Sequence, residues 1–133
     1  MKKILLAYDG GEPAKRALEQ TIELATRFEA QVGVISVVPV RSGRTAIDPW
    51  DDRTVHAEEL LEARRALREA GIEAEMLEPG GDVARTIERV ADERGYDTIV
   101  IGTRGVRSLA RTLQGSVSEH VASHAHVTVV VAR

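Results

Sequence analysis

The sequence predicts a single three-layer α/β domain, in which an open five-stranded parallel sheet carries helices on both of its faces. Two observations lead to this fold class. Short continuous apolar runs, such as 4–8 and 98–101, alternate along the chain with segments whose apolar residues recur at every third or fourth position. Glycine or proline follows most of these runs closely, as is typical where strands end. Because crossovers between parallel strands are right-handed, the intervening helices cover both sides of the sheet.

Length and composition describe an ordinary globular domain. The 133 residues suit one unit over 1–133, with 43% hydrophobic and 29% charged residues. A net charge of −3, spread along the chain, argues against a DNA or RNA surface, which needs concentrated Lys and Arg. The chain has no cysteine, and the apolar run after Lys3 is too short for a signal peptide or a membrane span. We therefore expect a cytoplasmic protein with neither nucleic-acid nor membrane partners.

Hydrophobic periodicity places the elements in order. Strands are predicted over 4–8, 32–38, 72–77, 98–101 and 127–131, and helices from Glu12, over 54–70, after Asp82 and over about 115–124. Local chemistry supports the helix ends, with Pro13 in a first turn, Gly71 as a stop and Asp82 as an N-cap. The stretches 40–52 and 103–114 show no period and are predicted as loops. The first is a long surface loop of a type that often carries function.

Apolar positions at helical spacing define the faces that we expect to be buried. They are Ala14, Ala17, Leu18, Thr21, Leu24, Ala25 and Phe28 in the first helix, Leu60, Ala63, Leu67 and Ala70 in the second, and Val83, Ala84, Ile87, Val90 and Ala91 in the third. The charged run 58–69 is interpreted as a solvated helix face, with Glu58, Glu62, Arg64 and Arg68 pointing outward.

Two glycine-containing clusters follow strands and predict where a ligand would bind. In open parallel sheets, ligands bind beyond the carboxyl ends of the strands. One cluster is Asp9-Gly10-Gly11, and the other begins with Gly102-Thr103-Arg104-Gly105 and ends with Gly115-Ser116-Val117 at the start of a helix. Free main-chain amides at a helix N-terminus attract anions, and Arg104, Arg107 and Arg111 add cations, so the second cluster is interpreted as a phosphate cradle. Taken alone, such glycines are better explained as the end of a strand and the start of a helix, but their pairing with the first cluster favours a ligand site.

Asp9 has two interpretations. A carboxylate would repel a phosphate, so it would face the other end of a nucleotide, where it could accept a hydrogen bond from a ribose hydroxyl or the adenine amino group. It could equally be an acid near a helix N-terminus, where the helix dipole favours negative charge. Its residue type and position alone leave the two interpretations equal.

The spacing of the glycines resembles a known signature. Gly102-x-x-Gly105, nine residues and then Gly115-Ser116 is similar to the Gly-2x-Gly-9x-Gly-Ser/Thr signature of the universal stress proteins, in the branch that binds ATP. The segments 4–10 and 97–105 are similar to the same family, and the resemblance covers the whole chain, most weakly at 40–52. It implies the strand order 3-2-1-4-5, which puts the first and fourth strands side by side.

The resemblance also implies a ligand and its binding residues. The implied cofactor is ATP or AMP, and the phosphates could hold an accompanying Mg2+ or Mn2+ ion. Asp9 would contact the nucleoside, and Val37 would meet adenine through its backbone. The implied binding residues are Ala7, Tyr8, Asp9, Val37, Ile101, Gly102, Arg104, Gly105, Gly115, Ser116, Val117 and Ser118. Members of the family often form homodimers through the last strand, here Val127 to Val131, whose apolar edge would need cover.

One departure from the family concerns Gly11, where members commonly carry serine. Glycine still serves as an N-cap, at a cost of about a few tenths of a kcal/mol, so the fold is expected to tolerate it. The departure removes one hydroxyl that could touch the ligand, and it therefore bears on affinity.

Histidines are the remaining candidates for a site. His120 and His124 share a helix face, but no third ligand is apparent, and histidines near a helix C-terminus are well explained by the dipole. His56 and His126 show no evident partners in the sequence. No metal site is expected.

The predicted function is regulatory binding of an adenine nucleotide in a stress response. No Ser/His/Asp set and no paired carboxylates are apparent near the cradle. The alternative is a slow ATPase or an autophosphorylating nucleotide-dependent switch, with Ser116 or Thr112 as phosphoryl acceptor. The chain lacks the Ser-Gly-Gly-x-Asp-Ser loop of ATP pyrophosphatases, a Walker loop and the Gly-x-Gly-x-x-Gly of dehydrogenases. Phospho-receiver domains need an aspartate and a lysine where this chain has Glu78-Pro79 and Ala132-Arg133.

Overall fold

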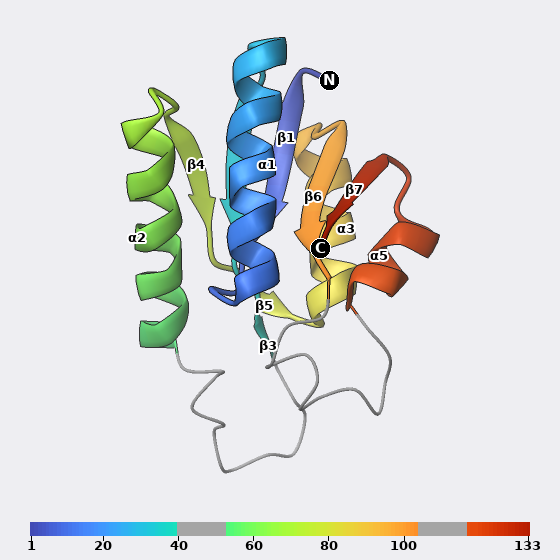
Figure 1. Cartoon of the computed structure of the whole chain (residues 1–133). Coiled ribbons are helices and arrows are strands. Elements are labelled where there is room, and N and C mark those ends of the chain that lie inside the picture. The colour runs from blue at the N-terminus through green and yellow to red at the C-terminus, as the bar shows by residue number, and fades with distance from the viewer. Residues whose placement is uncertain (40–52, 104–116) are drawn as a thin grey trace.

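The main sheet has five parallel strands. The computed structural model describes residues 1–39, 53–103 and 117–133 (Figure 1). The strands of this sheet are β1 (Lys3–Ala7), β2 (Gln31–Ile35), β4 (Ala74–Leu77), β6 (Thr98–Gly102) and β7 (Thr128–Ala132). They lie in the order β4-β2-β1-β6-β7, which is 3-2-1-4-5 when the strands of this sheet alone are counted. The predicted fold class and strand order are confirmed.

Four described helices cover the two faces of this sheet. They are α1 (Glu12–Phe28), α2 (Arg53–Glu69), α3 (Val83–Arg94) and α5 (Val117–His124). Figure 1 shows α1 and α2 on one face and α3 and α5 on the other. Side chains alternate along each strand, so Ile4 and Leu6 of β1 join the core beneath α1 and α2, while Leu5 joins the core beneath α3 and α5. Burial on both faces is the reason that the central strands β1 and β6 are apolar along most of their length.

The helix ends follow the predicted local chemistry. Helix α1 begins after Gly11, with Pro13 in its first turn, and ends at Glu29 in the left-handed conformation. The Asp82 carboxylate accepts a hydrogen bond from the Arg85 backbone amide at 3.1 Å, which confirms it as the N-cap of α3. Gly95 ends α3 at φ 74°.

Two predicted core positions are wrong. Phe28 is 55% exposed because it lies in the last turn of α1, which reaches past the ends of the strands (Figure 1). Ala70 is exposed because α2 ends at Glu69, so this residue belongs to the turn that follows. Periodicity assigns both residues to the apolar stripe, but the stripe continues beyond the surface that it packs against.

The predicted strand 32–38 is divided in two. After β2 ends at Ile35, the short strand β3 (Val38–Pro39) pairs in parallel with β5 (Gly80–Gly81) in a separate two-stranded sheet. The Ser36 amide donates to the Leu77 carbonyl at 3.0 Å and the Val38 amide donates to the Pro79 carbonyl at 2.8 Å. After Ile35 the chain therefore no longer pairs with β1 and instead hydrogen-bonds to the segment that follows β4.

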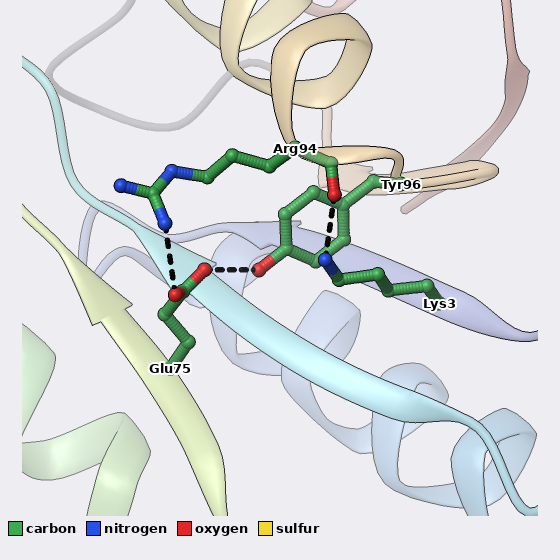
Figure 2. A network of polar contacts seen from close by, with 4 residues as sticks. All are labelled: Lys3, Glu75, Arg94 and Tyr96. Atoms are coloured by element: carbon green, nitrogen blue, oxygen red, sulfur yellow. Dashed lines mark hydrogen bonds and ion pairs between the residues drawn. The ribbon is translucent and has the colours of Figure 1, made fainter.

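A polar network closes the amino end of the sheet (Figure 2). The Tyr96 hydroxyl donates to Glu75 at 2.8 Å, and the Arg94 guanidinium donates to the same carboxylate at 2.9 Å. The Lys3 ammonium donates to the Arg94 carbonyl at 2.6 Å and lies 4.5 Å from the centre of the Tyr96 ring. This network lies at the end of the sheet opposite to the carboxyl ends of the strands.

No helix in the described part of the chain combines the length and apolar composition that a membrane crossing requires.

Candidate functional site

The carboxyl ends of β1, β2 and β6 meet at one edge of the sheet. Ala7, the last residue of β1, pairs with Ile35 of β2 on one side and with Ile101 of β6 on the other. The strand order reverses here, because the chain moves from β1 toward β4 and then crosses back to β6. Ligands of open α/β sheets bind at this reversal. The tertiary structure therefore brings the predicted residues of β1, β2 and β6 together.

The turn after β1 positions Asp9. Its Oδ1 accepts a hydrogen bond from the Gly11 amide at 2.9 Å, across Gly10, whose φ of 78° favours glycine. Among the described residues, no hydrogen bond to Oδ2 occurs, so this oxygen can accept one from a ligand. A Cβ on Gly11 would lie 3.2 Å from Asp9 Oδ1, so the glycine that departs from the family pattern leaves room for this turn.

The backbone of Val37 faces the end of β1. Ser36 and Val38 direct their amides toward the β4 side, as their hydrogen bonds to Leu77 and Pro79 show. Main-chain groups of consecutive residues in extended chain point to opposite sides, so the N–H and C=O of Val37 point toward β1. The Tyr8 amide makes the last bond between these two segments, to the Ile35 carbonyl at 3.0 Å. Val37 therefore presents one donor and one acceptor beyond the β1 ladder, in the described part of the chain.

At the end of β6, a close packing contact explains Gly102. A Cβ on this residue would lie 2.5 Å from the Pro13 carbonyl carbon and 2.8 Å from the Ala14 nitrogen, both in the first turn of α1. Ile101 is buried in the core beneath α3 and α5. These two residues can therefore offer a ligand only main-chain groups, and Gly102 also has a role in the fold that needs no ligand.

The predicted phosphate cradle falls mostly outside the described residues. Arg104, Arg107, Arg111, Gly105, Gly115 and Ser116 all lie there. Helix α5 is described from Val117, which is half-buried, and Ser118 is buried. Because α5 connects two parallel strands, it runs antiparallel to them, and its amino end lies at the same edge of the sheet as Asp9.

Helix α2 adds three polar side chains to this edge. His56 Nδ1 lies 2.6 Å from Ser36 Oγ and 3.9 Å from Glu59 Oε2. The Glu59 side chain packs on Gly10, where an added Cβ would be 3.2 Å from its Cγ. Glu62 accepts a hydrogen bond from the Tyr8 hydroxyl. The spacing of 56, 59 and 62 puts these side chains, the α2 column, on one face of the helix.

The α2 column corrects two expectations. His56 has partners, and the interpretation of 58–69 as a solvated face fails at Glu59, which is 6% exposed. Glu62 is exposed as predicted, although its carboxylate also accepts a hydrogen bond from Tyr8. The missed signal is the helical spacing of His56, Glu59, Leu60 and Ala63, which continues the apolar stripe with polar residues. Ser36 and Glu59 both face the same nitrogen of His56, so this set lacks the arrangement of a catalytic triad, in which serine and acid bind opposite nitrogens.

The surroundings of the Tyr8 hydroxyl disfavour its ionisation. Burial is the main cause that raises the pKa of Tyr8, and its hydrogen bond to Glu62 raises it further. The charges of Glu62, Glu59 and Asp9 act in the same direction. Tyr8 therefore serves as a hydrogen-bond donor to α2, with its side chain turned toward the core beneath α1 and α2.

Two of the other histidines contact α3, His120 from α5 and His126 from the turn that follows it. His120 Nδ1 lies 2.9 Å from Glu88, and His126 Nδ1 lies 3.0 Å from Asp92, so the expectation that His126 has no partner is wrong. The rings of His120 and His124 stack with their centres 4.2 Å apart. In the described ranges, no three His, Asp or Glu side chains are grouped as a metal site requires.

Comparisons with known proteins agree on one family. The family model described as the universal stress protein family matches residues 1–133. A universal stress protein of Methanocaldococcus jannaschii is 34% identical, over 99% of this chain and 82% of the relative. The structure of the universal stress protein from Archaeoglobus fulgidus in complex with dAMP has a TM-score of 0.76 and 26% identity, covering 100% of this chain and 98% of that one. A universal stress protein in complex with cAMP has a TM-score of 0.78 over 99% and 97% of the two chains, and at 20% identity it shows likeness of fold alone.

Proposed function

Because this chain belongs to the universal stress protein family, we propose that it binds an adenine nucleotide, ATP or AMP, as a regulatory ligand in a cytoplasmic stress response. The observation that carries the proposal is the placement of Asp9 and the Val37 backbone on neighbouring strand ends, at the reversal of strand order. The dAMP complex of the Archaeoglobus fulgidus relative supports an adenine nucleotide as the ligand.

Each end of the proposed site suits one part of the nucleotide. The Val37 N–H would donate to adenine N1 and its C=O would accept from the 6-amino group, whereas guanine presents a donor and an acceptor in the reverse arrangement. Asp9 Oδ2 would accept from a ribose hydroxyl. The amides and cations of Arg104, Gly105, Gly115, Ser116 and Val117 would hold the phosphates, with Mg2+ or Mn2+ as an accompanying ion.

Isothermal titration with ATP, AMP and GTP tests the proposal. We expect adenine nucleotides to bind at micromolar Kd or tighter and GTP to bind more weakly. Asp9→Asn should weaken ATP binding about tenfold, equivalent to about 1.4 kcal/mol. The matched control is Glu12→Gln, which removes an acid from the first turn of α1 and leaves Asp9 intact. Equal losses in the two variants would assign Asp9 to the helix dipole instead, and no heat with any adenine nucleotide would refute the proposed function.

The phosphate end of the site has its own test. Gly115→Val should abolish ATP binding while the protein remains folded, because a side chain there would block the approach of the phosphates to main-chain amides. Intact variant protein that still binds ATP as the wild type does would refute the assigned cradle. Steady release of ADP by the wild type would favour the alternative of a slow ATPase.

We also propose a homodimer through the last strand. Strand β7 is an edge of the main sheet, and Val131 on it is 39% exposed. An unpaired apolar edge favours pairing with a second copy. Light scattering should give twice the chain mass, and Val131→Lys should reduce it to a monomer. A monomeric wild type at micromolar concentration would refute this assembly.

A further inference from the structure

Helix α2 touches the ends of both strands that would hold the nucleoside. Its His56 contacts Ser36, which precedes Val37, and its Glu59 packs on Gly10, which follows Asp9. One face of one helix thus reaches the neighbours of both residues that are proposed to recognise the base and the sugar. None of the α2 column belongs to the implied binding residues themselves.

The contact between Ser36 and His56 is a buried one. Ser36 is 2% exposed and His56 is 5% exposed, and their polar atoms lie 2.6 Å apart. Buried polar groups are costly to leave without hydrogen bonds, so such a pair holds its members in one arrangement. Glu59, with Oε2 3.9 Å from the same His56 nitrogen, joins this arrangement to the turn at Gly10.

The pair acts where the sheet no longer constrains the chain on both sides. At Ile35, β2 is bonded to β1 and to β4, whereas Ser36 and Val38 are bonded through their amides only to the β4 side. The Ser36 side chain supplies a further attachment, toward α2. Ser36 shares a peptide bond with Val37, so an attachment at Ser36 acts directly beside the main-chain groups of Val37. A hydrogen-bonding site discriminates between bases only if its donor and acceptor are held in place.

We propose that His56 is a positioning residue for base recognition. Through Ser36 it orients the donor and acceptor of Val37, and with Glu59 it holds the turn that carries Asp9. This inference rests on the proposed function. It deepens that function because it makes contacts from helix α2, and not only the strand ends, responsible for the preference for adenine over guanine.

Variants of the pair test the inference against ATP and GTP. His56→Leu and Ser36→Ala should each weaken ATP binding about tenfold and change GTP binding less than about twofold, so the preference for adenine narrows. His56→Asn places an amide nitrogen near the position of Nδ1 and should restore ATP binding to within about threefold of the wild type. Rescue by asparagine distinguishes a positioning hydrogen bond from mere filling of space.

A matched control lies at the opposite end of the sheet. Tyr96→Phe also removes a side-chain hydrogen bond of a buried residue, here to Glu75, and should lower Tm while ATP affinity stays unchanged. Measurement of Tm for every variant identifies any that does not fold, and Ser36→Ala, which removes a single oxygen atom, keeps the test available if His56→Leu is unfolded.

The outcomes separate this inference from the proposed function. If the wild type binds ATP and folded Ser36→Ala keeps its affinity and base preference, the positioning role is refuted and the nucleotide site stands. Equal losses for ATP and GTP, or for Tyr96→Phe as well, would likewise refute it, because they indicate general destabilisation. If the wild type binds no adenine nucleotide, the proposed function itself fails and this inference fails with it.

Discussion

Gly33 lies against the hydroxyl of Tyr96, and a Cβ on this glycine would be 1.9 Å from the Tyr96 oxygen. Gly33 is in the middle of β2, and Tyr96 precedes β6, so the contact joins two strands separated by β1. Tyr96 is 2% exposed and donates to Glu75 on β4 (Figure 2). The missing side chain of Gly33 is what lets the ring cross β2 to reach that carboxylate.

Gly33→Ala should lower the free energy of unfolding by about 2 kcal/mol or more, because neither the strand nor the buried ring can move without loss of packing. Urea denaturation measures this change. Gly71→Ala is the matched control, since Gly71 has φ +80° but open space around it, and it should cost about 1 kcal/mol.

The double variant Gly33→Ala/Tyr96→Leu should be less destabilised than the sum of its single changes. Removal of the ring gives the new methyl group room, so the two changes are coupled. Strict additivity in urea denaturation would show that the contact does not limit position 33.

Alkaline titration should reveal both tyrosines of the chain as late-ionising groups. Burial is the main cause that raises the pKa of Tyr8 and of Tyr96, and the hydrogen bonds to Glu62 and Glu75 raise them further. In the unfolded chain a tyrosine ionises at about pH 10. Stability from these groups is therefore complete below about pH 10 and is lost as the pH rises toward the folded pKa values.

Absorbance at alkaline pH, followed together with circular dichroism, checks this expectation. Phenolate should appear only above about pH 10, together with loss of helix signal. Ionisation of either tyrosine at about pH 10, in a protein that keeps its full helix signal, would contradict the burial and hydrogen bonding of these side chains.

Asp97→Asn should destabilise the protein at neutral pH. Burial alone raises the pKa of Asp97, but the Lys2 amide, the Thr98 hydroxyl and the Lys3 amide donate to its carboxylate and lower the pKa overall. A lowered pKa means that the stability is present above the unfolded value of about 3.9 and is lost as the pH falls through the folded value.

The size of the effect follows from the bonds that are weakened. We expect a loss of about 1–2 kcal/mol at pH 7, measured by urea denaturation, and a gap to the wild type that closes below about pH 3. A gap that stays constant as the pH falls would show that the charge of Asp97 contributes nothing.

Gly102→Ala should destabilise the protein in the absence of any nucleotide. The new Cβ would lie 2.5 Å from the backbone of Pro13, where no side-chain rotation can relieve it, so the first turn of α1 must move. A cost of about 2 kcal/mol or more is expected from thermal or urea unfolding of the ligand-free protein. Unchanged stability with lost ATP affinity would show that this glycine serves only the ligand.

The sequence by itself determined the elements whose cause is local. Strands such as 98–101 are continuously apolar because both faces are buried, and the Asp82 cap acts on an amide three residues away. The spaced glycines, through resemblance to the family, predicted the strand order and the edge of the sheet at which Asp9, Val37 and Gly102 meet.

Only the tertiary structure decided which residues take part from a distance. The helical stripe that contains His56 and Glu59 predicts a buried face, but nothing local indicates that Ser36 and Gly10 lie opposite them. The sequence around Gly33 does not indicate that the Tyr96 side chain packs against this glycine. Likewise, the apolar character of Phe28 does not indicate that it lies beyond the surface of the sheet and is exposed. Periodicity records which side of an element is buried, whereas the partner on the other side is set by how segments far apart in the chain pack together.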